Sequence, residues 1–501
     1  MLFNSAQFLI FLPIVVLIYF IIPQRVRYIW LLVCSYYFYM CWNAKYALLM
    51  LFSTFTTYLC GLGIEHIKHM DCPAGRAVRL KKRCVAASLI INLGILFFFK
   101  YFDFAWENLA RVLALGGITL AAPKFDIILP VGISFYTFQA LGYTIDVYRD
   151  DIYAEKNFLR YALFVSFFPQ LVAGPIERSK NLLRQLAAPA KFRFENLRDG
   201  LLIMLWGYFL KLVIADRLGI YVDSVYANWE SYIYAAWYLI IAAIFFVIQV
   251  YCDFYGYTMI ATGAARILGV QLMRNFDAPF LSQSVTEFWR RWHISLSSWF
   301  KDYLYIPLGG NRKGKLRKYL NILITFTVSG LWHGANWTFV VWGFLNGLFQ
   351  VIGDLLKPVR SFVIRILSLK RDGIGLTLLR IMVTFSLFAL SMVFFRAPSV
   401  WAACQILRGI FHADNIWILF DGSLTVGTGL NPQNMGLLIA ALCVLLFSDI
   451  LRCKNISAQE IIAKQDWLCQ IAVIALSVLF ILLFGIWGGT YDAASFIYFQ
   501  F

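Results

Sequence analysis

The stretch YLNILITFTVSGLWHGANWTFVVWGFLNGLFQ, residues 319–350, is largely apolar and contains one histidine, His333, but no Asp, Glu, Lys or Arg. As one α-helix this run would reach about 48 Å, whereas the hydrocarbon core of a membrane is about 30 Å thick. The run is too long for one perpendicular crossing and too short for two, so it predicts a tilted, broken or re-entrant helix. Places for a break or a close backbone approach are supplied by Gly330, Gly334, Gly343 and Gly347.

The composition of the whole chain places this run in a polytopic membrane protein. Of its 501 residues 61% are hydrophobic and 14% are charged, against about 25% charged in soluble proteins. Apolar runs long enough, or nearly so, to cross a membrane recur from end to end. They are 7–22, 28–42, 46–63, 85–99, 201–214, 232–250, 376–395, 435–447 and 468–487. The fold expected is all-α, and the first run is expected to be a retained span because no basic residue precedes it.

The net charge of +17 is concentrated between the apolar runs. Positive residues cluster in the segments 68–83, 178–198, 312–318, 357–371 and 452–464. By the positive-inside rule these are cytoplasmic loops, which places both termini and the net negative segment 216–230 on the outer side. Charge distributed in this way indicates membrane topology and gives no support to nucleic-acid binding.

Motifs for metal, disulfide or nucleotide chemistry are missing from the sequence. The ten cysteines include no CxxC pair and no His/Cys cluster at zinc spacing. There is also no GxSxG, Walker or GxGxxG motif, and no internal repeat. We therefore expect residues 1–501 to form one membrane domain without a bound metal or cofactor.

Five histidines remain as candidates for chemistry. His66, His69 and His412 lie in basic or polar segments and are interpreted as solvated. His293 lies in EFWRRWHISLSSWFKDYLYIPLGG, residues 287–310, where aromatic residues recur at helical spacing opposite charged ones. The pattern predicts an amphipathic helix at the cytoplasmic face with His293 on its apolar side. That histidine is then either functional or part of a structural hydrogen-bond network.

His333 lies near the middle of the run 319–350, where non-helical backbone is tolerated only beside protein or a water-filled cavity. We expect it to line such a cavity, or else to hydrogen-bond a neighbouring helix for packing. A neutral imidazole is a general base near neutral pH and takes a proton from a hydroxyl that attacks an activated acyl group. This chemistry needs no metal or redox cofactor and suits acyl transfer across a membrane.

Five motifs together resemble the membrane-bound O-acyltransferase family, in particular its bacterial alginate O-acetyltransferase-like branch. They are FPQLVAGPI (168–176), NFDAPF (275–280), EFWRRWHISLSSWFKDYLYIPLGGNR (287–312), SGLWHGANWTFVVWG (329–343) and FFRA (394–397). The likeness runs from the N-terminal MLFNS to the last residue. One departure is Met259, after CDFYGY, where relatives carry an acidic residue, so no role is transferred to that segment.

The resemblance implies a bundle of many helices around a central tunnel in the bacterial cytoplasmic membrane. His333 corresponds to the family's essential histidine inside the tunnel, and His293 to a second functional position toward the cytoplasmic entrance. The implied donor substrate is acetyl-CoA, whose phosphates the basic inner loops would attract unless those loops serve topology alone. The implied acceptor is an exported polysaccharide, reached directly or through an extracytoplasmic acyltransferase or the polysaccharide-export machinery.

The C-terminal FIYFQF, residues 496–501, resembles an aromatic tail of this branch in which a tyrosine relays the acyl group, and the matching residue is Tyr498. The structural alternative is a tyrosine that anchors the last helix at the membrane interface. Two other functions stay open: transfer of D-alanine from a carrier protein to teichoic acid, and, in a different class, a glycan transporter or flippase. A transporter is expected to show internal repeats or paired broken helices, and a pure scaffold would not need His333.

Overall fold

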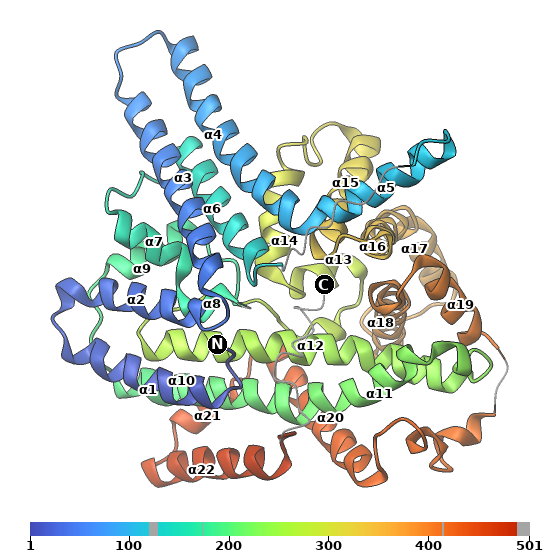
Figure 1. The fold of residues 1–501 in the computed structure, drawn as a ribbon. Coiled ribbons are helices and arrows are strands. Elements are labelled where there is room, and N and C mark those ends of the chain that lie inside the picture. Colours follow the sequence, from blue (N-terminus) through green and yellow to red (C-terminus); the bar gives the residue numbers. More distant parts are fainter. Residues whose placement is uncertain (120–128, 173, 413–414, 488–501) are drawn as a thin grey trace. The chain divides into compact units, whose positions relative to one another are not determined.

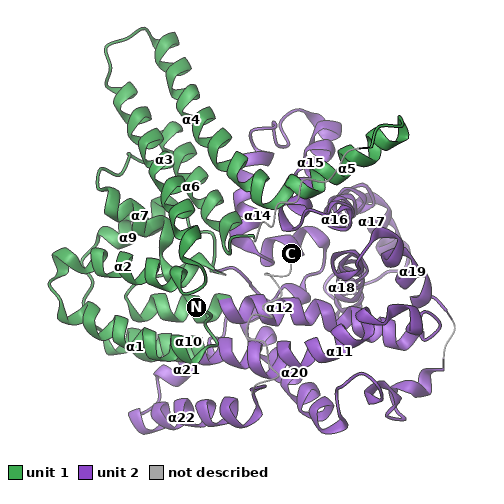
Figure 2. Cartoon of the chain, viewed as in Figure 1, with its two compact units in different colours: residues 1–204, 258–273 green, residues 205–257, 274–501 purple. Residues whose placement is uncertain are grey.

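The protein is all-helical in the part of the chain that its computed structural model describes (Figure 1). The described residues are 1–119, 129–172, 174–412 and 415–487. The chain forms two compact units (Figure 2). Unit 1 comprises residues 1–204 and 258–273, and unit 2 comprises residues 205–257 and 274–501. The all-α fold predicted from the apolar runs is confirmed.

Seven helical stretches of the described chain are long and apolar enough to cross a membrane. They are Ala44–Lys68, Ala74–Leu115, Ala236–Ile267, Trp337–Leu355, Ile374–Arg396, Pro432–Cys453 and Trp467–Phe484. Two shorter apolar helices, Ala6–Ile21 and Val400–Ile410, accompany them. The expected polytopic membrane protein is therefore confirmed.

Unit 1 is centred on three helices, α3, α4 and α6, that pack on one another. Its helices are α1 (Ala6–Ile21), α2 (Arg27–Met40), α3 (Ala44–Lys68), α4 (Ala74–Leu96), α5 (Phe102–Leu115), α6 (Ile133–Tyr148), α7 (Phe158–Ser166), α8 (Phe168–Leu171) and α9 (Ser179–Ala187), and α10 (Phe194–Tyr208) leads into unit 2. A Cβ on Gly61 would lie 2.7 Å from Cε1 of Tyr143, and the hydroxyl oxygens of Ser88 and Thr144 lie 3.1 Å apart. Small residues and interhelical hydroxyl bonds of this kind hold membrane helices together.

Unit 2 contains the remaining helices and both histidines of interest. They are α11 (Asp216–Ala227), α12 (Ala236–Ile267, which continues into unit 1), α13 (Val285–Arg291), α14 (Ile294–Phe300), α15 (Gly314–His333), α16 (Trp337–Leu355), α17 (Lys357–Ile366), α18 (Ile374–Arg396), α19 (Val400–Ile410), α20 (Pro432–Cys453), α21 (Ala458–Ala463) and α22 (Trp467–Phe484). Helix α16 packs against both α15 and α18, so these three helices form a continuous group.

Helices α15 and α16 form a hairpin, so of the tilted, broken and re-entrant arrangements expected for the run 319–350 the structure has the broken one. Both helices extend beyond the run, to Gly314 and Leu355. Helix α15 ends at His333, and the side chain of Asn336 caps the first turn of α16. The two backbones approach so closely that a Cβ on Gly330 would lie 3.0 Å from Cα of Gly343. The glycines therefore set the spacing of the hairpin at the end of which His333 is held.

A buried ion cluster joins α11 and α12 within unit 2. The Lys211 ammonium lies 2.9 Å from Oδ1 of Asp216 and 2.7 Å from Oδ1 of Asp253, and all three side chains are buried. Lys211 lies in the π-helical turn Phe209–Ala215. Charges inside membrane proteins are tolerated when they pair in this way. Asp216 and Arg217, which begin the segment expected on the outer side, are thus both packed inside unit 2.

Candidate active site

His333 is enclosed by aromatic rings from three helices of unit 2. Its ring centroid lies 5.0 Å from that of Trp332 on α15, 5.1 Å from Trp342 on α16 and 5.5 Å from Phe395 on α18. All three contacts are T-shaped, which is the favoured arrangement of aromatic pairs. Only 8% of the residue is exposed, so the imidazole is shielded from bulk water.

His293 lies at a break between two helices. The continuous amphipathic helix predicted over residues 287–310 is wrong, because α13 ends at Arg291 and α14 begins at Ile294. His293 adopts φ 43° and ψ 54°, a left-handed conformation that interrupts helical hydrogen bonding. The physical reason is Asn275, whose backbone carbonyl accepts a 2.9 Å hydrogen bond from the N–H of Ile294 in place of a helical partner.

The side chain of Asn275 gathers three donors on one oxygen. Its Oδ1 lies 3.2 Å from Nδ1 of His293, 3.2 Å from the backbone nitrogen of Ser295 and 2.9 Å from Oγ of Ser295. Because a backbone N–H only donates, the amide atom that faces Ser295 is the oxygen. That oxygen only accepts, so Nδ1 of His293 carries the proton and Nε2 carries the lone pair.

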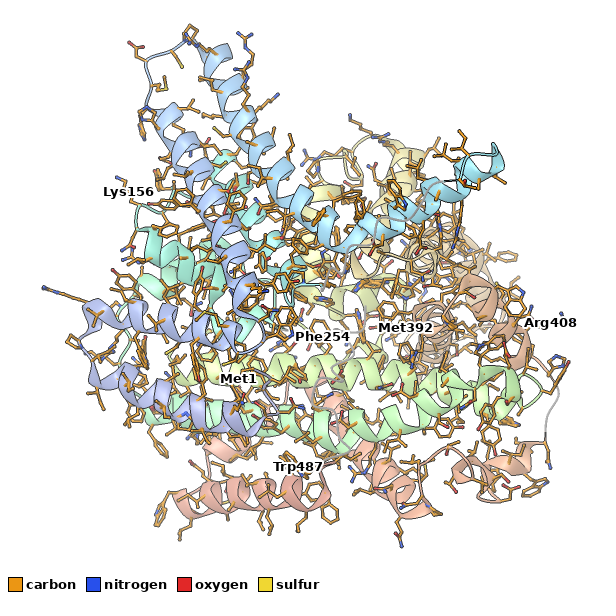
Figure 3. All side chains as sticks on the ribbon, viewed as in Figure 1. Met1, Lys156, Phe254, Met392, Arg408 and Trp487 are labelled. Carbon is orange, nitrogen blue, oxygen red and sulfur yellow. The ribbon has the colours of Figure 1, made fainter. Side chains whose placement is uncertain are left out.

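Burial keeps His293 neutral. The residue is 2% exposed, as its place on the apolar side of the sequence pattern predicts. The ring of Phe254, labelled on α12 in Figure 3, lies edge-on at 4.7 Å, and the ring of Phe276 lies at 6.4 Å. His293 is outside the seven membrane-length helices, and burial lowers its pKa to about 3 because the charged imidazolium is poorly solvated there. At physiological pH it therefore stays neutral and accepts a hydrogen bond at Nε2.

The structure brings the two sequence-predicted histidines into one site. Their ring centroids lie 6.5 Å apart, and Trp332 lies beside both, 6.4 Å from His293 and 5.0 Å from His333. A direct hydrogen bond spans about 2.7–3.2 Å, so the two imidazoles are too far apart to bond one another. The two imidazoles are nevertheless close enough for both to contact one bound group.

The other sequence candidates lie elsewhere. His66 and His69 lie at the end of α3 in unit 1, and His412 lies just after α19; all three are exposed, as expected. Tyr498 falls outside the described residues. Within the described ranges, no group of three or more His, Cys, Asp or Glu side chains is placed to hold a metal ion.

Asn275 is a site residue that sequence reasoning missed. It opens the motif NFDAPF, but its spacing of 18 residues from His293 matches no helical or strand period. The only signal in the sequence was the motif itself. Its contact with His293 depends on the loop that leads from α12 to α13, so only the fold reveals it.

Comparison with known proteins identifies the class. The model of the membrane-bound O-acyltransferase family, MBOAT, matches residues 151–395, which include both imidazoles. The chain is 35% identical to the probable alginate O-acetylase AlgI of Pseudomonas aeruginosa, over 91% of this chain and 82% of the relative. It is 31% identical to the peptidoglycan O-acetyltransferase of Helicobacter pylori, over 100% of this chain and 98% of the relative. A teichoic acid D-alanyltransferase of Streptococcus thermophilus is 30% identical over 45% of this chain and 56% of the relative.

The family match and the relatives, together with the all-helical membrane fold, show a membrane-embedded acyltransferase. The chain belongs to the membrane-bound O-acyltransferase family, and the resemblance read from the five motifs is confirmed. It is an enzyme whose reaction is O-acyl transfer.

Proposed function

We propose that this protein transfers an acetyl group from cytoplasmic acetyl-CoA for the O-acetylation of an exported cell-surface polysaccharide, with His333 as the general base. The observation that carries the proposal is the buried pair of imidazoles, His293 and His333, 6.5 Å apart in an aromatic enclosure. The names of the relatives, an alginate O-acetylase and a peptidoglycan O-acetyltransferase, support acetyl as the acyl group. The corresponding location is the cytoplasmic membrane of a bacterium.

In the proposed reaction the acceptor hydroxyl lies against His333. The imidazole takes the hydroxyl proton while the oxygen bonds to the carbonyl carbon of the thioester. The carbon–sulfur bond then breaks, the acetyl group stays on the oxygen as an ester, and the imidazolium returns its proton to the departing thiolate. His333 is thereby regenerated as the neutral imidazole.

Two further groups of the site fit this step. The indole N–H of Trp342 is buried and has no hydrogen-bond partner among the described residues, and its ring lies 5.1 Å from that of His333. It is a donor for the negative charge that develops on the carbonyl oxygen. Nε2 of His293 is an acceptor, and we propose that it binds an amide N–H of the pantetheine arm and so orients the thioester.

Transfer of D-alanine from a carrier protein to teichoic acid is the second candidate. It is supported by the relatives named teichoic acid D-alanyltransferase, which align with 45% of this chain. The two candidates share the thioester chemistry and differ in the donor. Supplying acetyl-CoA and a D-alanyl-charged carrier protein to the same preparation in separate reactions distinguishes the two candidate functions.

We also propose that Tyr498 relays the acyl group to an extracytoplasmic acyltransferase or to the polysaccharide-export machinery. The support is the likeness of the tail 496–501 to the aromatic tail of the family branch. Full acetylation of the polysaccharide in cells carrying Tyr498→Phe would exclude the relay and leave the tyrosine as an interface anchor.

The test of the reaction is turnover by purified protein in liposomes, measured as release of free thiol from acetyl-CoA and, in a parallel reaction, from a D-alanyl-charged carrier protein. Wild type, His333→Ala and His412→Ala are compared, since His412 is an exposed histidine of the same unit. We expect turnover in wild type and His412→Ala and its loss in His333→Ala. Equal turnover in all three would reject His333 as the base, and turnover with the charged carrier alone would assign the D-alanyl reaction.

A further inference from the structure

The contacts of Asn275 point to a role beyond holding a loop together. We propose that Asn275 is a positioning residue that fixes the tautomer and the direction of His293, so that Nε2 is the nitrogen presented to substrate. The inference rests on the proposed function for its kinetic consequence. Its structural part, the state of the imidazole, stands on the geometry alone.

One oxygen of Asn275 is shared by three donors. Oδ1 of Asn275 receives the backbone N–H of Ser295, the hydroxyl of Ser295 and Nδ1–H of His293. The two donors from Ser295 hold the amide in one orientation, because turning it over would place its NH₂ group against an N–H. With the amide held, only the Nδ1–H tautomer of His293 forms a hydrogen bond. Ser295 therefore determines, through Asn275, which ring nitrogen of His293 carries the proton.

The backbone around Asn275 also bonds to the backbone on both sides of His293. The carbonyl of Asn275 accepts from the N–H of Ile294, and the N–H of Asp277 donates at 2.9 Å to the carbonyl of Arg291. These two bonds hold the chain on both sides of His293, whose left-handed φ of 43° is unfavourable for a non-glycine residue. Such conformations persist when surrounding contacts over-determine them, and they cluster at functional sites. The Asn275 loop is thus the frame that keeps His293 in this conformation.

The other ring nitrogen of His293 is not used by Asn275. Nε2 of His293 is buried without a partner among the described residues, and buried polar atoms of that kind need an explanation. Its ring neighbours are Phe254, Phe276, Trp332 and His333. Of these neighbours, His333 has the only ionisable side chain. The arrangement therefore presents a bare lone pair within the site.

The test variants change Oδ1 of Asn275, the acceptor of the His293 hydrogen bond. Asn275→Asp keeps an acceptor in place and adds negative charge, so it preserves the tautomer and favours the imidazolium. Asn275→Leu removes the acceptor at similar volume. Asn321→Leu is the matched control, because Asn321 is an equally buried amide of the same unit that donates to the carbonyl of Gly310 and does not contact His293.

The experiment is nitrogen NMR of full-length protein labelled with ¹⁵N-histidine in liposomes, with His293 assigned by comparison with His293→Asn. We expect wild type, Asn321→Leu and Asn275→Asp to show a protonated Nδ1 at His293, and Asn275→Leu to show a mixture of tautomers. A protonated Nε2 in wild type, or an unchanged tautomer in Asn275→Leu, would overturn the assignment. This readout is independent of turnover, so it stands apart from any failure of the proposed reaction.

Kinetics supplies the second readout. We expect Asn275→Leu to lower kcat at least tenfold, and Asn275→Asp to restore most of it while moving the acidic limb of the kcat–pH profile to higher pH. A purely structural role predicts instead equal losses in both variants, with no change of profile. If Asn275→Leu fails to fold, Asn275→Asp alone decides, since an unshifted profile and an altered tautomer would each contradict the proposal.

Discussion

The imidazole of His293, at the start of α14, and that of His333, at the end of α15, lie with ring centroids 6.5 Å apart. Each histidine lies where a helix is interrupted, one at a left-handed residue and the other just before the turn of a hairpin. Both rings face Trp332. Two histidines that are remote in sequence thus belong to one candidate site.

The first prediction concerns the pair as a unit. General-base catalysis contributes about 10²–10⁴-fold, so His333→Ala should lower kcat by at least about 10²-fold. His293→Asn removes the imidazole and keeps a residue that tolerates a left-handed backbone. If both groups serve one step, the double variant should be nearly as active as His333→Ala alone, because such effects are not additive. Losses that multiply in the double variant would instead indicate separate steps.

The second prediction concerns the hairpin. A Cβ at residue 330 or 343 would press on the backbone of the facing helix, so Gly330→Ala and Gly343→Ala should each destabilise the protein by about 1–3 kcal/mol. Gly353→Ala in α16 is the control, because no heavy atom lies within 4 Å of its added Cβ. The measurement is the apparent melting temperature in detergent. Equal melting of Gly343→Ala and Gly353→Ala would show that the close approach does not limit packing.

The third prediction concerns the buried ion cluster. Lys211→Met leaves the carboxylates of Asp216 and Asp253 without their shared cation. Removing one member of a buried ion pair costs about 3–5 kcal/mol, so we expect a large drop in the apparent melting temperature. Lys454→Met, at an exposed lysine after α20, should melt like wild type. A normal melting temperature for Lys211→Met would mean that the carboxylates find other partners or protons.

The fourth prediction is a pH dependence of stability. The pKa of His293 is lowered by burial to about 3, against about 6.5 in an unfolded chain, so below pH 6.5 the unfolded state binds the extra proton. The free energy of unfolding is therefore unaffected by this histidine above pH 6.5 and decreases as the pH falls from 6.5 toward 3. At pH 5 the decrease is about 2 kcal/mol. Comparing the melting of wild type and His293→Asn between pH 7.5 and pH 5 isolates this residue. Parallel loss of stability in both proteins would contradict the prediction.

A tilted, broken or re-entrant arrangement of the run 319–350 could be predicted from the sequence because a helix has a fixed rise and a membrane a fixed thickness. The choice among the three could not, because α15 and α16 extend beyond the run at both ends. Length and composition likewise predicted the all-α polytopic fold. Chemical reasoning also selected His333, since imidazoles are rare at membrane depth, and His293, since it lies on the apolar side of an amphipathic pattern. These predictions depend on local patterns, which one sequence contains in full.

The break at His293 could not be predicted in that way. The apolar periodicity continues through Trp292 toward Trp299, so every local signal favours one helix. The competing interaction comes from Asn275, which is remote in sequence and reaches the histidine only after the chain has folded. Lys211 is a similar case, because its partner Asp253 lies on another helix. The apolar periodicity of a sequence does not reveal long-range contacts between polar side chains.

The ion cluster of unit 2 also bears on the order in which the chain enters the membrane. A lone Lys or Asp in the middle of a crossing helix costs about 2.5–3.5 kcal/mol to insert. Lys211 and Asp216 lie on one continuous helical segment and pair across one π-helical turn, so their charges offset one another locally. Asp253 lies on the membrane-length helix α12 and pairs with the same ammonium. We therefore expect the carboxylate of Asp253 to be stabilised in the membrane by a cation that is synthesised before it.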